Sequence, residues 1–202
     1  DSATVRPALE LAGRDAFILV DDWQSADVLL LNGAIPDPEL MRTRLEQGAG
    51  LVLILGPDIS PEAFSGLCGI KVAFRRTDEP ASFVDVPIGD PIARQIVWNG
   101  APQIRDRYIV ETPVSSVQPL VTGYEDGNWL IWRLQSSNAF VVDFFLGKDD
   151  NPQIREWAYY NYLIYHLTHA SGPVGSGSAP GSGTTVVAAG PGTGSGSSAP
   201  AT

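Results

Sequence analysis

The segment ADVLLLNGAIPDPELMRTRLEQGAGLVLILGPDIS, residues 26–60, holds two apolar runs separated by a helical pattern. The runs at 27–32 and 51–56 are rich in Leu, Val and Ile and alternate little, which is typical of strands covered on both faces. Between them, Asp37 is a capping residue for a helix over 38–47. A strand, a helix and a strand in this order indicate a parallel sheet with flanking helices.

The pattern continues on both sides of this segment. Helices are also predicted at 2–13, 61–67 and 151–170, and strands at 16–20, 70–75, 82–86, 104–110, 117–122, 128–134 and 139–146, with a hairpin turn in GYEDGN at 123–128. We therefore predict a three-layer α/β domain over residues 1–170. It has a mainly parallel sheet flanked by helices, additional antiparallel strands and a C-terminal helix.

The last part of the chain, residues 171–202, contains only Gly, Ser, Pro, Ala, Thr and Val. This composition cannot bury enough apolar surface to offset the entropy of ordering the chain. We therefore expect a disordered tail or an extended linker, which leads to a further domain or a membrane anchor if the chain continues. If it ends at Thr202, we expect the tail to lie along a partner.

Composition excludes several classes of partner and cofactor. The net charge of −10 argues against nucleic acid, because an acidic domain repels phosphate backbones. No apolar run reaches the roughly 18–20 residues that span a bilayer. The chain has one cysteine, Cys68, so an internal disulfide is impossible, and its apolar neighbours indicate a buried residue rather than a nucleophile. Without GxGxxG or P-loop motifs, no nucleotide cofactor is expected.

ADVLLLNGAIPD at 26–37 and GAGLVLILGPDIS at 48–60 resemble the class I glutamine amidotransferase-like (flavodoxin-like) family. NAFVVDFFLG at 138–147 and the helix at 151–167 look like the last strand and helix of degenerate members, which occur in bacterial membrane and surface proteins. The resemblance implies a first strand ahead of the first helix. No such strand precedes the helix predicted at 2–13.

Active members of this family carry a Gly-x-Cys-x-Gly nucleophile elbow, whereas this sequence reads GPDIS at 56–60. Asp58 stands at the cysteine position and Ser60 at the last glycine. The elbow needs an exposed thiol with backbone N–H groups beside it, and a carboxylate cannot perform acyl transfer in that way. The family's His-x-Glu pair is also missing, since His166 and His169 lie in the final helix. The resemblance therefore implies the fold without its chemistry, and we expect no catalytic residues.

A ligand cleft is the alternative interpretation. Asn32, Gly33, Gly56 and Asp58 fall where strands meet loops at the carboxyl edge of the sheet, where such folds bind ligands. Asp143 interrupts the apolar run VVDFF and either pairs in the core or faces the cleft. These five residues are our cleft candidates for a small-ligand-binding or residual hydrolase domain. The glycines are equally compatible with plain turns.

The final helix carries an unusual number of aromatic side chains and no formal charge after Glu156. One of its faces is sufficient to pack on the sheet, which leaves Tyr159, Tyr162 and His166 to the side or opposite. Tyrosines in such positions are typical of interfaces. His166 and His169 are three residues apart on a helix, but no further ligand completes a metal site there. We predict a partner interface and no metal.

These observations predict a non-catalytic scaffolding or docking domain of a membrane-associated extracytoplasmic complex, periplasmic or at the cell surface. Its expected partners are protein subunits of that assembly, and it needs no cofactor. A cytoplasmic location is the alternative to an extracytoplasmic one. An envelope or filament subunit is a further alternative function.

Overall fold

The computed structural model of the chain describes residues 2–12, 16–85, 91–111, 116–135, 137–172 and 184–189. Its main sheet contains β1 (Phe17–Val20), β2 (Val28–Asn32), β3 (Gly50–Ile54), β5 (Phe83–Asp85), β7 (Val117–Gly123), β8 (Trp129–Leu134), β9 (Ala139–Val142) and β10 (Thr184–Ala189). Their order is β1-β10-β2-β3-β9-β8-β7-β5. Neighbours from β1 through β9 in this order pair in parallel, and β8, β7 and β5 add antiparallel pairs.

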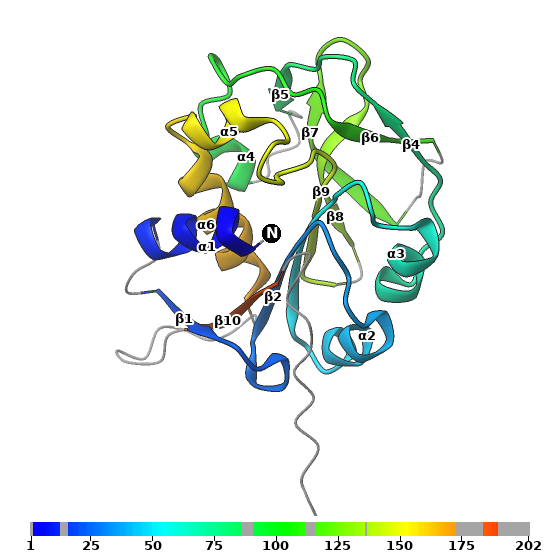
Figure 1. The fold of residues 1–202 in the computed structure, drawn as a ribbon, viewed down its shortest axis with the longest axis vertical. Coiled ribbons are helices and arrows are strands. Elements are labelled where there is room, and N and C mark those ends of the chain that lie inside the picture. Colours follow the sequence, from blue (N-terminus) through cyan, green and yellow to red (C-terminus); the bar gives the residue numbers. More distant parts are fainter. Residues whose placement is uncertain are drawn as a thin grey trace, which may run out of the picture.

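A two-stranded antiparallel sheet, β4 (Phe74–Thr77) with β6 (Arg107–Val110), lies near one end of the main sheet (Figure 1). Helices cover both faces of the main sheet (Figure 1). One face carries α1 (Ser2–Ala12), α4 (Pro91–Gln95), α5 (Pro152–Glu156) and α6 (Tyr160–Ser171), and the other carries α2 (Pro38–Glu46) and α3 (Pro61–Cys68). The predicted three-layer α/β fold, with its additional antiparallel strands, is confirmed.

Burial on both faces explains the unbroken apolar runs of the central strands. In β3, Val52 and Ile54 join the core beneath α1 and α6, while Leu51 and Leu53 join the core beneath α2 and α3. All five residues of β2 are buried as well. At 25 cal/mol for each Å² of apolar surface removed from water, such strands supply much of the driving force for folding.

Local signals place the helices that follow these strands. The side chain of Asp37 accepts a hydrogen bond from Leu40 N, so the predicted cap of α2 is confirmed. Ser60 accepts a bond from Ala63 N and begins α3 in the same way. Gly69, with φ of 69°, ends α3 in a left-handed conformation that glycine adopts without steric cost.

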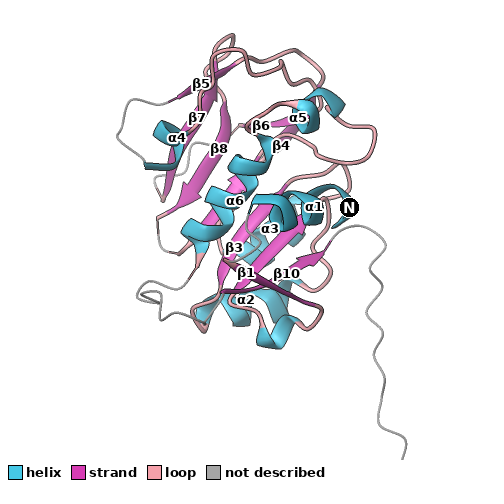
Figure 2. Cartoon of the chain, turned by 90° about the vertical axis from the view of Figure 1, so that its left-hand side faces the viewer, coloured by secondary structure: helices cyan, strands magenta, loops and turns pink. Residues whose placement is uncertain are grey.

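The prediction of a single helix over 151–170 is wrong in one respect, because the structure divides this segment into α5 and α6. Trp157 ends α5 with an extended backbone (φ −69°, ψ 131°). Asn151 was expected to cap this helix, but its side chain makes no capping bond and its φ is 40°. Helix α4 was not predicted, and α6 lies over the sheet beside α1 (Figure 2).

For residues 184–189, the expectation of a disordered tail or linker is also wrong, because they form β10. This strand runs parallel between β1 and β2, with Val186, Val187 and Ala189 buried. The other tail residues lie outside the described part of the chain.

A side-chain contact fixes the start of β10. The backbone N–H and the hydroxyl of Thr185 both donate to Oδ2 of Asp27, at 2.8 and 2.7 Å. In return, Asp27 N donates to the carbonyl oxygen of Thr185 at 2.9 Å. Asp27 precedes β2 directly, so this Asp27–Thr185 contact sets the register between the two strands.

We expect Asp27→Ala to lower the free energy of unfolding by about 1–3 kcal/mol, because the backbone N–H of Thr185 loses its carboxylate acceptor in a half-buried place, while the hydroxyl keeps only the carbonyl oxygen of Ser25. Urea unfolding followed by tryptophan fluorescence measures the change. The matched control is Asp21→Ala, whose side chain is 98% exposed. That change is expected to stay within about 0.5 kcal/mol. Equal effects of the two changes would show that the Asp27–Thr185 contact does not stabilise the domain.

Candidate functional site

The predicted cleft residues lie at the carboxyl ends of three neighbouring strands, β2, β3 and β9. Asn32 is the last residue of β2, and Gly33 follows it. Gly56 and Asp58 follow β3, and Asp143 comes directly after β9. The structure therefore gathers the five at one edge of the sheet, but their individual environments differ strongly.

Asn32 is buried and serves to join distant segments. Its Nδ2 donates to Thr4 Oγ1 at 2.8 Å and to the carbonyl oxygen of Leu146 at 3.2 Å. Thr4 Oγ1 also lies 2.9 Å from the same Leu146 oxygen. These bonds hold α1 against the segment that follows β9. The amide of Asn32 is therefore engaged within the domain.

Gly33 and Gly56 bring two loops into direct backbone contact. Gly33 has φ of 75°, and its N–H donates to the carbonyl oxygen of Ile54 at 2.9 Å. A Cβ atom on Gly56 would lie 2.5 Å from Cα of Gly33, closer than real Cβ contacts. The space beside the elbow position is thus filled by backbone, and the close approach itself requires glycine.

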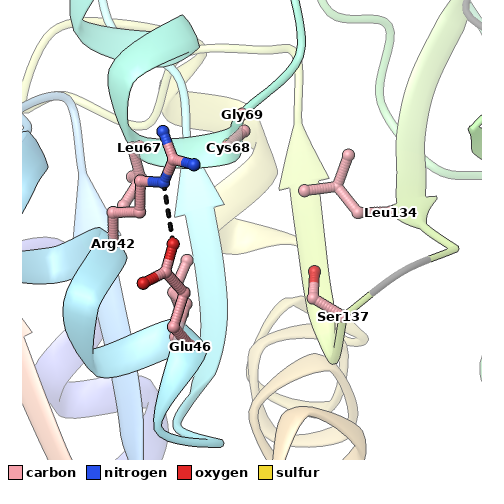
Figure 3. A pocket seen from close by; sticks show the side chains of 8 residues that line it. Arg42, Glu46, Leu67, Cys68, Gly69, Leu134 and Ser137 are labelled. Carbon is pink, nitrogen blue, oxygen red and sulfur yellow. Dashed lines mark hydrogen bonds and ion pairs between the residues drawn. The ribbon is translucent and has the colours of Figure 1, made fainter.

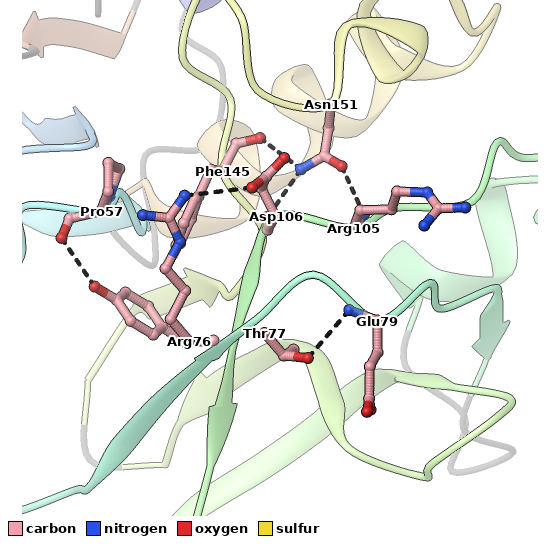
Figure 4. A network of polar contacts seen from close by, with 9 residues as sticks. Pro57, Arg76, Thr77, Glu79, Arg105, Asp106, Phe145 and Asn151 are labelled. Atoms are coloured by element: carbon pink, nitrogen blue, oxygen red, sulfur yellow. Dashed lines mark hydrogen bonds and ion pairs between the residues drawn. The ribbon is translucent and has the colours of Figure 1, made fainter.

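Asp58 lies in an exposed turn that Ile59 N closes by donating to Gly56 O at 3.1 Å. The last residue of GPDIS, Ser60, is occupied in capping α3. Beside this turn, the Tyr108 hydroxyl donates to the carbonyl oxygen of Pro57 at 3.1 Å (Figure 4). Burial raises the pKa of Tyr108, and the negative charge of Asp58 adds to that rise against the opposing charge of Arg76.

Asp143 is wholly buried, in contrast to Asp58. Its Oδ1 accepts a hydrogen bond from Trp132 Nε1 at 2.7 Å. Burial raises the pKa of Asp143 well above its usual range, while the Trp132 bond and the charge of Arg107 oppose that rise. With one carboxylate exposed and one buried, Asp58 and Asp143 are not a pair of buried carboxylates that could share a proton.

Arg107 is a buried residue that sequence reasoning missed. Its side chain is 1% exposed and its Nη2 donates to Asp126 Oδ2 at 2.6 Å. Partial burial alone would raise the pKa of Asp126, but bonds from Asn128 and Arg107 lower it overall. Within the described residues, Arg107 Nε and Nη1 and Asp143 Oδ2 have no hydrogen-bond partner. Because the predicted strand at 104–110, IRDRYIV, holds two arginines and an aspartate, no local signal distinguishes Arg107 as the buried one.

Asn151 holds the loops around this edge together (Figure 4). Its Oδ1 accepts from Arg105 N at 2.8 Å, and its Nδ2 donates to the carbonyl oxygens of Asp106 and Phe145 at 2.8 and 3.1 Å. These three bonds explain why the side chain does not cap α5. They join the segment before β6 to the segment after β9, so Asn151 has a structural role.

Cys68 lies at the far end of α3 from the elbow turn. It borders a pocket of about 210 Å³ between α2, α3 and the β8–β9 turn, beside the ion pair of Arg42 and Glu46 (Figure 3). Burial raises the pKa of the Cys68 thiol, so the thiolate is disfavoured. The single cysteine therefore stands neither at the nucleophile position nor in an activating environment. No group of three metal-ligating side chains exists among the described residues.

Helix α6 carries a row of rings that we call its aromatic face: the exposed Tyr162 and His169 and the half-buried Tyr165 and His166. Ring centroids are 5.6 Å apart for Tyr162 and His166, 5.2 Å for Tyr165 and His166, and 5.8 Å for Tyr165 and His169. Tyr162 is 56% exposed. Burial and the neighbouring His169 lower the pKa of His166, which favours the neutral form of that side chain. Tyr159, also predicted as an interface residue, lies half-buried against Trp157.

No protein-family model matches the sequence, and no curated protein matches it. Among solved structures, the chain is similar to the cytoplasmic protein STM1381 from Salmonella typhimurium LT2, with a TM-score of 0.62 and 13% identity over 85% of this chain and 87% of that one. It also matches a ThuA-like protein from Bacteroides uniformis ATCC 8492, with a TM-score of 0.48 and 13% identity over 70% of this chain and 67% of that one. At this identity, the first likeness shows a shared fold alone.

No helix in the described part of the chain is both long and apolar enough to cross a membrane.

We expect Gly56→Ala to lower the free energy of unfolding by about 1–3 kcal/mol, because the added methyl group collides with backbone that cannot rotate away. Chemical denaturation measures the change. The control is Gly66→Ala in α3, where a Cβ meets only Pro38 Cβ at an ordinary 3.4 Å. There the helix is expected to gain about 0.5–1 kcal/mol. A neutral Gly56→Ala would mean that the two loops separate readily.

Asp143 should make stability depend on pH. Because its pKa is raised in the folded state, the folded protein holds this proton more tightly than the unfolded chain, and stability falls as pH rises above about 4. Asp143→Asn removes that penalty while it keeps an acceptor for Trp132. We expect its free energy of unfolding to exceed that of the unaltered protein at pH 8, and to do so by less at pH 4.

Asp143→Ala is the comparison variant, because it leaves Trp132 Nε1 buried without an acceptor. Relative to Asp143→Asn, this change should cost about 1–3 kcal/mol at every pH. Urea titrations at several pH values measure both variants. If the difference between Asp143→Asn and the unaltered protein did not vary with pH, Asp143 would be ionised in the folded state at all of them, held by Arg107.

Proposed function

We propose that this chain is a non-catalytic docking domain that contacts a protein partner through the aromatic face of α6. The observation that carries the proposal is this row of exposed and half-buried rings on that helix, in a domain whose net charge is −10. Tyrosine is enriched at protein interfaces because its ring can be buried while its hydroxyl finds a partner. Tyr162, at 56% exposed, is the expected centre of the contact.

The state of the elbow supports the non-catalytic part of this proposal. Gly33 and Gly56 fill the space beside the turn with backbone, and Ser60 is engaged as a helix cap. The thiol of Cys68 lies at the opposite end of α3 from the elbow turn and is held protonated by burial. Acyl transfer by the family's route needs an activated nucleophile at this turn.

We also propose that the partner is a protein subunit of a membrane-associated extracytoplasmic assembly. The support is the resemblance of 26–37, 48–60 and 138–147 to degenerate members found in membrane and surface proteins. A cytoplasmic location, and a role as an envelope or filament subunit, are the alternatives. They differ from the first proposal in the partner rather than in the docking face.

A second candidate function is small-ligand binding at the carboxyl edge of the sheet. One observation favours it: the buried atoms Asp143 Oδ2, Arg107 Nε and Arg107 Nη1 have no partner among the described residues. A small polar molecule that entered beside them would meet a ready donor and a ready acceptor.

The docking proposal is tested by purifying a tagged full-length chain from its native host under mild conditions, with mass spectrometry of the intact complex. We expect a partner in fixed ratio, and we expect Tyr162→Ala to reduce its recovery about tenfold, which corresponds to the loss of one central interface contact. The matched control is Tyr124→Ala. Tyr124 is 78% exposed in the β7–β8 turn and outside the aromatic face.

The two tyrosine variants separate the possible outcomes. Recovery that falls for Tyr162→Ala and not for Tyr124→Ala supports docking through α6. Equal recovery for both variants, or a chain that runs alone, contradicts it. In that case, a ligand screen with Asp143→Asn as the impaired variant tests the second candidate.

A further inference from the structure

Six consecutive residues, Thr184–Ala189, make the contacts that hold β10 in the main sheet. Its backbone pairs with β1 from Thr184 to Val187 and with β2 from Val186 to Ala189. Parallel pairing on both edges satisfies N–H and C=O groups that would otherwise be unpaired at β1 and β2. Proteins that bind extended peptides by adding a strand to a sheet use this same type of contact.

Side chains give this place in the sheet a preference for sequence. Thr185 is recognised by Asp27 through its N–H and its hydroxyl. Val186 is buried in the core beneath α1 and α6, while Val187 and Ala189 are buried in the core beneath α2 and α3. A charged side chain at any of these three positions would be buried without a partner. The site therefore accepts an extended, uncharged strand with Thr opposite Asp27 and small or β-branched residues after it.

The body of the domain reaches β10 through residues 173–183, PVGSGSAPGSG. A stretch of this length spans at most about 40 Å. The contacts described above join β10 to β1, β2 and Asp27, and they are the same whichever molecule supplies the strand. Exchange of an identical element between two copies keeps every such contact, which is why swapped dimers form at little energetic cost.

We propose that the space between β1 and β2 is a strand-binding site, and that β10 of a second copy of this chain occupies it in exchange with β10 of the same chain. The balance between the two depends on the local concentration that the connecting segment creates for its own strand. Exchange between copies therefore grows with protein concentration. This inference does not rest on the docking function proposed for α6.

A photo-cross-linking experiment on the full chain distinguishes the two sources of the strand. Ile18 is 50% exposed on β1 and is the Cα partner of Thr185, so a benzophenone amino acid at position 18 lies beside β10. Copies that carry it are mixed with ¹⁵N-labelled copies that retain Ile18. The mixture is unfolded in urea and refolded at several protein concentrations, then irradiated and digested. We expect adducts between position 18 and labelled β10, in a fraction that rises with concentration.

The labelled copy also supplies the controls. Val186→Asp places a charge at a buried position of β10 and should lower the mixed adduct at least tenfold. Val174→Asp, the same exchange outside β10, should leave it unchanged. Adducts confined to β10 of the same molecule at every concentration would overturn the proposal. Mixed adducts that persist with Val186→Asp would overturn it as well, because they would not depend on strand pairing.

Discussion

Backbone pairing between β1, β10 and β2 is the constraint on which the parallel half of this domain depends. Strands buried on both faces cannot turn unpaired N–H or C=O groups toward water, so each must have a neighbour on both edges unless it ends the sheet. Without β10, β1 would lose the partner it has in the described structure, and β2 would become an edge. The cores beneath α1 and α6 and beneath α2 and α3 both include β10 side chains.

At the carboxyl edge of the same sheet, where open α/β sheets bind ligands, the domain's own side chains and backbone occupy most of the positions. Asn32 binds α1 and the segment after β9, and Gly33 rests on Gly56. Ser60 caps a helix, and Asn151 joins the segment before β6 to the segment after β9. Side chains that would face a substrate in a working cleft therefore stabilise the domain. The polar atoms of Arg107 and Asp143 are the exception, and they are buried rather than exposed.

Local sequence patterns were sufficient to predict most elements. An apolar run indicates β2 and another indicates β3, and a capping residue indicates the start of α2. Asp37 begins α2 as its sequence suggests. The missed features depend on partners far away in the chain. Thr185 and Asp27 are separated by 158 positions in the chain. The segment TTVVAA is surrounded by Gly, Ser and Pro, so its pairing with β2, rather than its sequence neighbourhood, determines that it forms a strand. The role of Arg107 depends on Asp126 and Asp143, which only the fold brings beside it. The side chain of Asn151 binds the backbone of Arg105 and Phe145 instead of capping a helix, and this choice also depends on the fold.

The position of β10 also has a consequence for synthesis. A ribosome makes Asp27, at the start of β2, 158 positions before Thr185 of β10, so the parallel half of the sheet cannot close until that whole intervening length has been made. Long-range pairing of this kind slows folding and leaves strand edges exposed in the meantime. During translation, β1 and β2 therefore wait for the strand that pairs between them, and the arrival of β10 completes this half of the sheet.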